Sequence, residues 1–320
     1  MEKEQIDNAQ STLAKFIEEL GSLRKLPQLV YFSSIFPQDW EKLRNVVSEY
    51  KKKNPQIQEI DFVLHSPGGT PEDAYRIIRT LRNNFDKVNI VVPFWAKSAA
   101  TLLSLGASEI IMDDSAEFGP LDVQLPKQKE DSPKYERESA LTDEASLKLL
   151  EDKSRSLFKT MFKELYEDDE IPIQRKDLSE QLLSYASKLY EPLLKQINPY
   201  KLGEKKRKLD VSTKYAHRIL LQYNKEAVTE KMRYDVVDFL VNSCPEHGYV
   251  VDYDIVSIFL PIIRKSIEIS GEYQVKLSQV TSFCMSEAGE IEFIGFMYEE
   301  AEKTKKIIKM SKKDRAKASK

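Results

Sequence analysis

Two short motifs in the first half of the chain carry residue types that could perform acyl-transfer chemistry. The first, His65–Gly69, reads His-Ser-Pro-Gly-Gly and follows an apolar run. Gly68 and Gly69 lack a Cβ and can adopt positive φ angles, so their backbone N–H groups can come close to a bound carbonyl. Each such donor stabilises a developing oxyanion by on the order of 3 kcal/mol. This segment is a candidate oxyanion hole, although Pro-Gly-Gly alone is more often a simple turn.

The second motif supplies a candidate nucleophile. Residues Ala96–Ala100 read Ala-Lys-Ser-Ala-Ala, after one apolar run and before a stretch of small residues that is typical of a helix. A serine at the start of a helix exposes its hydroxyl at the positive end of the helix dipole. The amide of Ala99 would then be a second oxyanion donor. Serine is also a common N-cap, so capping is the alternative interpretation of Ser98.

The elements that must position these motifs alternate between strand and helix. Apolar runs predict strands, and apolar residues at helical spacing predict helices between them. Such alternation indicates an α/β fold with a mostly parallel sheet covered on both faces. Both motifs follow strands, at the C-terminal strand ends where such sheets bind ligands. The expected strands are Leu26–Ser34, Ile57–Leu64, Val88–Phe94 and Ser108–Met112, and the expected helices are Trp40–Lys53, Thr70–Asn84 and Ser98–Leu105.

The second half of the chain has a different character. A polar loop is expected over Pro126–Glu138, followed by helices over Thr142–Tyr166 and Leu178–Leu194. Farther on, Tyr273–Val280 and Glu290–Met297 suggest a hairpin, which would turn at residues 287–290. We therefore expect a catalytic domain with a helical extension at residues 1–200, a small α+β region at 211–302, and a disordered basic tail at 303–320.

Composition excludes several classes of protein. No apolar window approaches the roughly 20 residues that cross a bilayer, and the first 20 residues lack the features of a secretory signal. The net charge of -3 offers no electrostatic case for nucleic acid. The only cysteines, Cys244 and Cys284, fit reduced core thiols better than a disulfide framework. We expect a cytoplasmic protein with no transmembrane segment, cofactor or metal.

Several motifs in order carry a resemblance to a known family. They are Ile60–Gly69, Lys87–Pro93, Ala96–Leu102, Ala107–Asp113 and Phe118–Gln124. In sequence and spacing they resemble the serine dehydrogenase proteinase (SDH) family of the Clp/crotonase superfamily. They are more distantly similar to signal peptide peptidase A and the proteolytic subunit of the Clp protease.

The resemblance implies a spiral of ββα units with Ser98 as the nucleophile. It also implies an oxyanion hole formed by Gly69 or Gly68 together with Ala99. The implied activity is ATP-independent cleavage of peptides or unfolded proteins by a homo-oligomer. The family more often has glycines directly after the nucleophile, where this chain has Ala99 and Ala100; a helix tolerates their methyl groups.

The general base is harder to assign, because no histidine lies between Ser98 and Lys201. Related enzymes use a lysine, and burial can lower the pKa of a lysine enough for it to act as a base. We expect that role for Lys153, two to three turns into the helix that starts at Thr142, with Lys148 as the alternative. The remaining candidates fit other roles: Lys159 and Lys163 as surface charges, Lys97 as a side chain that points away from Ser98, His65 as a support of its turn, His217 as structural, and His247 as a residue of unassigned role.

Three functions therefore remain open. The first is a serine peptidase that acts through an acyl-enzyme on Ser98 with a lysine base. The second is a crotonase-like enzyme for thioesters, although those enzymes lack a serine nucleophile at this position. The third is a catalytically degenerate scaffold or binding protein, which the missing base keeps open.

Overall fold

A computed structural model of the chain describes residues 3–121, 124–127, 136–168, 173–286 and 292–297. The chain divides into two compact units, and each is described by itself. The first unit combines Met1–Leu121 with Val211–Lys320, and the second is Asp122–Asp210. No helix among the described residues is both long enough and apolar enough to span a bilayer.

A six-stranded sheet forms the centre of the first unit, in the order β10-β1-β2-β3-β5-β9. All neighbours are parallel except β10, which pairs with β1 in the antiparallel sense. Almost every residue of β1, β2 and β3 is buried, as expected for strands covered on both faces. The predicted α/β class with a mostly parallel sheet is confirmed. The strands are β1 Gln28–Phe32, β2 Glu59–His65, β3 Lys87–Val92, β5 Glu109–Met112, β9 Ile263–Lys265 and β10 Phe293–Met297.

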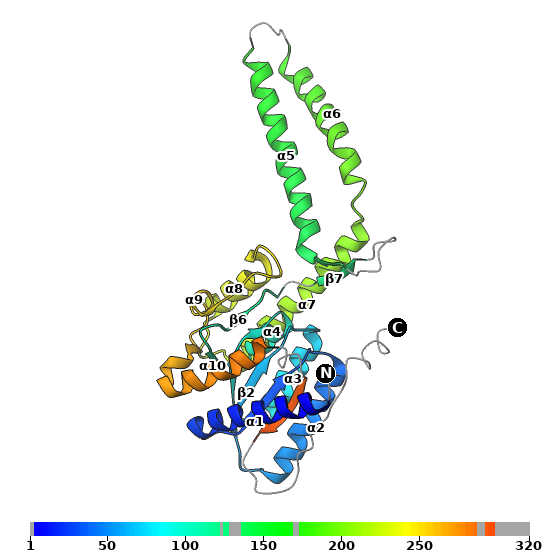
Figure 1. The fold of residues 1–320 in the computed structure, drawn as a ribbon. Helices are drawn as coiled ribbons and strands as arrows, with labels where there is room; N and C mark the ends of the chain where they lie inside the picture. The colour runs from blue at the N-terminus through cyan, green and yellow to red at the C-terminus, as the bar shows by residue number, and fades with distance from the viewer. Residues whose placement is uncertain (1–2, 122–123, 128–135, 169–172, 287–291, 298–320) are drawn as a thin grey trace. The chain divides into compact units, whose positions relative to one another are not determined.

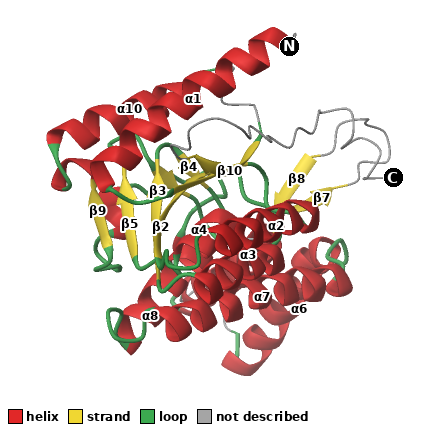
Figure 2. Ribbon diagram, turned by 90° about the horizontal axis from the view of Figure 1, so that it is seen from below, coloured by secondary structure: helices red, strands yellow, loops and turns green. Residues whose placement is uncertain are grey.

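Helices cover both faces of this sheet. On one face, α1 (Lys3–Arg24) and α10 (Gly271–Met285) lie side by side (Figures 1 and 2). They share a core with alternate strand residues such as Val30, Val63 and Val91. Figure 2 shows α2 (Pro37–Lys53), α3 (Pro71–Asn84) and the short α4 (Ala99–Ser104) on the other face. Because helices cover both faces of the sheet, a ligand can reach it at the ends of the strands.

The C-terminal part of the chain does not form a region of its own. Strands β9 and β10 complete the sheet, so the chain after residue 210 returns to the first unit. This division differs from the expected one at residues 1–200 and 211–302. The expected strand Tyr273–Val280 is wrong, because it lies inside α10. Its apolar residues Tyr273, Leu277, Val280 and Cys284 recur at helical spacing and are buried in the core shared with α1.

The rest of the first unit consists of short elements. They are β4 Trp95–Ala96, β6 Glu117–Phe118, α8 Glu230–Asp238, the π-helix Phe239–Ser243, α9 Tyr253–Val256 and the 3-10 helix Ser266–Glu268. Strands β4 and β6 form a separate parallel pair beside the main sheet. The expected tail 303–320 and the expected turn at 287–290 lie outside the described residues.

The second unit is mainly helical, as predicted. Two short antiparallel strands, β7 (Gln124–Lys127) and β8 (Glu136–Ser139), stand where a loop was expected. Two long helices follow, α5 (Ala140–Tyr166) and α6 (Arg175–Leu194), which pack against each other. Helix α7 (Pro199–Tyr223) then leads into the first unit.

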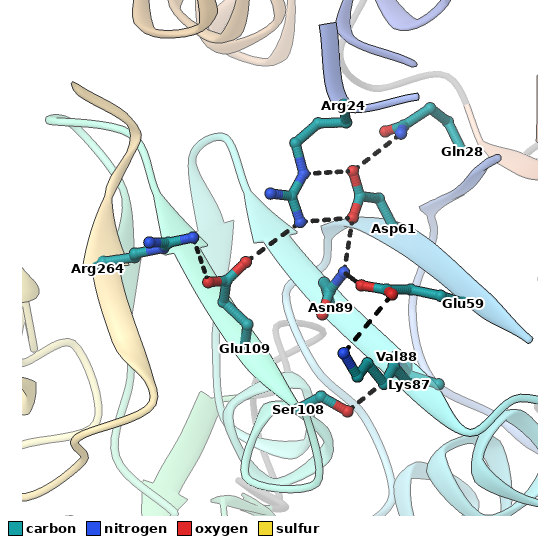
Figure 3. Close-up of polar contacts among 10 residues, drawn as sticks. All are labelled: Arg24, Gln28, Glu59, Asp61, Lys87, Val88, Asn89, Ser108, Glu109 and Arg264. Carbon is teal, nitrogen blue, oxygen red and sulfur yellow. Dashed lines mark hydrogen bonds and ion pairs between the residues drawn. The ribbon is translucent and has the colours of Figure 1, made fainter. Parts of the chain in front are cut away.

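A buried polar row crosses the sheet at the starts of its strands (Figure 3). Gln28, Asp61, Asn89 and Glu109 lie directly opposite one another on β1, β2, β3 and β5. The fully buried Asp61 carboxylate accepts hydrogen bonds from Arg24 at 3.1 and 3.2 Å, from Gln28 at 2.9 Å and from Asn89 at 3.1 Å. A slip of one residue would separate these partners, so the row fixes the register of the strands. That register determines where each strand ends, at the edge that carries both motifs.

Candidate active site

Ser98 occupies a strained turn between β4 and α4. Its backbone has φ 50° and ψ -115°, and Lys25 is the only other described non-glycine residue with positive φ. A non-glycine residue in such a conformation costs on the order of 1–3 kcal/mol and persists where its surroundings hold it. Helix α4 starts at Ala99, but the Ser98 side chain makes no capping hydrogen bond. The capping interpretation is therefore wrong for this geometry, and the half-buried hydroxyl is not used to stabilise the helix.

The two motifs, about thirty residues apart in sequence, are in contact. The Ser66 N–H donates to Trp95 O at 2.8 Å, and the Lys97 N–H donates to Ser66 O at 3.0 Å. Gly68 has φ 95°, and a Cβ there would lie 2.6 Å from Lys97 O and 3.0 Å from Ser98 Cβ. Only glycine fits so close to the serine. The structure thus brings together the glycine turn and the serine that the sequence singled out.

Gly69, the second glycine of the turn, pairs with Ile35 in a parallel β-bridge. The Ile35 N–H donates to Gly68 O, and the Thr70 N–H donates to Ile35 O, both at 2.9 Å. A Cβ on Gly69 would lie 2.0 Å from Ile35 O, so this approach also requires glycine. This pairing places the N–H of Gly69 on the side away from Ile35, as the geometry of a parallel bridge requires.

The backbone amides of the turn differ in whether they are used. The Gly68 N–H donates to Ser66 Oγ at 3.1 Å. The N–H groups of Gly69 and Ala99 have no acceptor among the residues that the structure describes. Unpaired amides next to a half-buried serine can donate hydrogen bonds to an anionic oxygen at little reorganisation cost. Of the two glycines, the geometry therefore favours Gly69 over Gly68 as a donor to a ligand.

A third segment contacts the residues on either side of Ser98, and the sequence motifs did not assign it a role. Residues Glu117–Gly119 lie beside the turn that contains Ser98, because β6 pairs with β4. The Thr101 hydroxyl lies 2.8 Å from Gly119 O and accepts the Gly119 N–H at 3.1 Å. One sequence signal was available: Thr101 is a polar side chain in an otherwise apolar stretch, Ala99–Leu103.

Lys97, adjacent to Ser98, points toward that third segment. Its Nζ lies 2.7 Å from Glu117 Oε1 and donates to Phe118 O at 3.2 Å. Both partners of this ammonium group therefore belong to β6, Glu117–Phe118. This agrees with the expectation that its side chain points away from Ser98.

The predicted base candidates belong to the second unit. Lys153 and Lys148 both lie on α5, and both side chains are exposed. Lys159 and Lys163, on the same helix, are exposed as well. Because Ser98 belongs to the first unit, the assignment of a lysine base stays a prediction.

His65 contacts the start of β4, and its expected support of its own turn stays a prediction. The ring packs among Phe32, Phe94 and Trp95, and its Nδ1 accepts the Trp95 N–H at 3.2 Å. Burial lowers the pKa of His65 to about 4, so the imidazole is neutral at physiological pH. Its fixed acceptor holds the start of β4, three residues before Ser98.

The other polar candidates lie elsewhere. His217, on α7, packs against Tyr234, and burial lowers the pKa of this imidazole. His247 lies in a turn closed by the Tyr249 N–H and Glu246 O at 3.0 Å. Cys244 and Cys284 are buried cysteines that form no disulfide, as predicted. Within the described part of the chain, no three His, Cys, Asp or Glu residues are grouped so as to hold a metal ion.

Comparison with known proteins finds a family model that is similar to this region. Residues 29–183 match the model of the ClpP-like SDH-type serine proteinases. The predicted resemblance is confirmed for these residues. They include both motifs, the third segment and the helix that carries Lys148 and Lys153.

Individual relatives match shorter stretches. Two uncharacterized proteins of Methanocaldococcus jannaschii are 39% and 37% identical over 71 residues. These stretches are 22% of this chain but only 25% and 24% of the relatives. Among solved structures, a membrane-bound stomatin-specific protease aligns over 48% of this chain and 66% of its own, with 15% identity and a TM-score of 0.29. A ClpP1 variant from Listeria monocytogenes aligns over 29% of this chain and 54% of its own, with 16% identity and a TM-score of 0.26.

Proposed function

We propose that this protein is an ATP-independent serine peptidase that cleaves peptides or unfolded proteins through an acyl-enzyme on Ser98. The observation that carries the proposal is the fit of Gly68 against Ser98, with the free amides of Gly69 and Ala99 beside it. The match of residues 29–183 to a serine proteinase family supports the same chemistry. The crotonase-like alternative is disfavoured because a thioester enzyme of this fold does not need the strained serine.

The proposed reaction has two steps. Ser98 Oγ attacks the scissile carbonyl carbon while a base takes the hydroxyl proton, and the carbonyl oxygen becomes an oxyanion. The amides of Gly69 and Ala99 stabilise that oxyanion, the C–N bond breaks, and the leaving amine takes the proton from the base. Water then attacks the ester, assisted by the same base, and releases the acid and Ser98.

We assign the base to a lysine of α5, Lys153 in the first place and Lys148 as the alternative. The assignment rests on the family resemblance. Alanine variants of Lys153 and Lys148, with Lys159→Ala as the matched surface control on the same helix, test it. The alanine variant of the lysine that acts as the base should lose both probe labelling and peptide cleavage. These activities should return at higher pH only if another group takes the proton from Ser98. Full activity in both variants would overturn the lysine assignment but leave Ser98 in place.

A fluorophosphonate probe tests the nucleophile directly. The wild-type protein should be labelled on a peptide that contains Ser98, and Ser98→Ala should not be labelled. Ser104→Ala is the matched control, because Ser104 is a buried serine on the adjoining helix that donates only to Ala100 O. Failure of the folded wild-type protein to react would overturn the proposed peptidase and favour the scaffold function. The homo-oligomer and the cytoplasmic location stay predictions, and light scattering tests the first of them.

A further inference from the structure

Two side chains of the nucleophile turn hold the segment Glu117–Gly119 from opposite sides of Ser98. Lys97 precedes the serine by one residue and Thr101 follows it by three. The sequence motifs gave neither Lys97 nor Thr101 a role in the proposed reaction. We call this pair, with its partners, the Lys97–Thr101 clamp.

Thr101 forms the buried half of the clamp. Only 1% of the residue is exposed. Its Oγ1 lies 2.7 Å from Ala96 O and 2.8 Å from Gly119 O, so its single proton is shared between these carbonyls. The same oxygen accepts the Gly119 N–H at 3.1 Å. One hydroxyl therefore joins the strand before Ser98, the helix after it and the neighbouring segment.

Lys97 forms the other half. Besides its contacts with Glu117 Oε1 and Phe118 O, its aliphatic stem lies flat on Gly119. A Cβ on Gly119 would lie 2.8 Å from Lys97 Cδ, so the glycine makes room for the stem. The side chains of Lys97 and Glu117 are each only 17% exposed, which limits screening of this ion pair by water.

The strain at Ser98 explains why a clamp is needed. Helix α4 has only six residues, and no side-chain cap holds its first turn. Such a helix has little stability of its own. A positive φ at Ser98 would relax if the flanking residues could move. Relaxation would turn both the Ser98 hydroxyl and the Ala99 amide away from the unpaired amide of Gly69.

We propose that Lys97 and Thr101 are positioning residues that hold Ser98 and the Ala99 amide in reactive geometry. The inference rests on the proposed function, because it concerns the reactivity of Ser98. Thr101 acts through the backbone of residues 96 and 119 and touches no reacting atom. The clamp should therefore change the rate of the chemical step and leave the affinity for a probe unchanged.

Thr101→Val tests the buried half, since valine keeps the shape of threonine and removes the hydroxyl. The readout is fluorophosphonate labelling, separated into probe affinity and maximal rate. Thr101→Val should lower the maximal rate by about 100-fold, the loss typical of a small misplacement of a reacting group. The affinity should stay within about twofold. Thr101→Ser, which keeps the hydroxyl, should recover most of the rate, and Ser104→Ala should react like wild type.

The possible outcomes distinguish a failure of the clamp proposal from a failure of the proposed peptidase function. Equal maximal rates for folded Thr101→Val, Thr101→Ser and wild type would overturn the clamp while the peptidase stands. An unreactive wild type would overturn both. If Thr101→Val does not fold, the double variant Lys97→Met/Glu117→Gln provides the test, because it removes the ion pair without leaving either charge alone. It should lower the maximal rate about tenfold at unchanged affinity, and an unchanged rate would overturn the clamp.

Discussion

The strand termini form two edges of the central sheet, one where the parallel strands start and one where they end, which we call the serine edge because it carries Ser98. Polar groups are paired differently at these two edges. At the starts of the strands, the Asp61 carboxylate accepts four hydrogen bonds from three side chains (Figure 3). Beyond the ends of the strands, the amides of Gly69 and Ala99 have no acceptor among the described residues, and Ser98 is strained. Buried polar groups that are paired specify the register, whereas groups left unpaired are available to a substrate.

The comparison predicts that variants at the two edges fail differently. Removal of the Ser98 hydroxyl should abolish activity and leave stability nearly unchanged. A change in the polar row should lower stability and leave the activity of the folded fraction nearly unchanged. Four predictions test this separation, from the largest expected effect to the smallest.

Ser98→Ala should have the largest effect on activity. Loss of the nucleophile should lower the rate of peptide cleavage by at least about 10⁴-fold. Its free energy of unfolding should change by less than about 0.5 kcal/mol, because the side chain makes no capping hydrogen bond. Ser98→Gly should be equally inactive but more stable than wild type by about 1 kcal/mol, since glycine relieves the positive φ. Urea unfolding and cleavage assays measure both quantities, and an inactive Ser98→Gly that is less stable than Ser98→Ala would contradict the strain argument.

Gly69→Ala should cause the next largest loss of activity. A Cβ there meets Ile35 O at 2.0 Å, so the turn must shift and carry its free amide with it. The expected loss is about 10² to 10³-fold in kcat, the cost of one oxyanion donor. Gly203→Ala is the control, because a Cβ on this helical glycine meets nothing within 4 Å. It should keep full activity and gain up to about 1 kcal/mol of stability. Equal activity of the two variants would exclude the Gly69 amide from catalysis.

Asp61→Ala tests the opposite edge. It leaves the guanidinium of Arg24 with Glu109 as its remaining carboxylate partner, at 3.2 Å. Loss of one member of a buried ion pair typically costs 3–5 kcal/mol, and we expect about 3 kcal/mol because Glu109 remains. Labelling of Ser98 per folded molecule should stay within about twofold of wild type. A large loss of labelling in the folded protein would show that the two edges are coupled.

The sequence predicted more of the serine edge than of the rest of the fold. Strand β2 and helix α3 follow from local periodicity, and so does the position of Ser98 after a strand. The pairing of Ile35 with Gly69 and the three-residue strand β9 were not predictable, because they depend on contacts between distant parts of the chain. The helix α10 was mistaken for a strand because Tyr273, Val275 and Leu277 alternate locally with polar residues. Thr101 was missed because its place in an apolar stretch indicates burial but does not identify the groups that its hydroxyl contacts.

His65 links the two edges, since it lies on the same strand and the same face as Asp61. Its pKa is lowered to about 4 by burial, compared with 6.5 when unfolded. A histidine whose folded pKa is depressed contributes stability above pH 6.5, and that contribution is lost as pH falls toward 4. The expected loss is on the order of 3 kcal/mol over this window. His65→Gln keeps a side-chain oxygen to accept the Trp95 N–H but does not titrate, so its unfolding free energy should fall less steeply between pH 6.5 and 4. Parallel pH profiles for the two proteins would show that the imidazole is not buried as a neutral group.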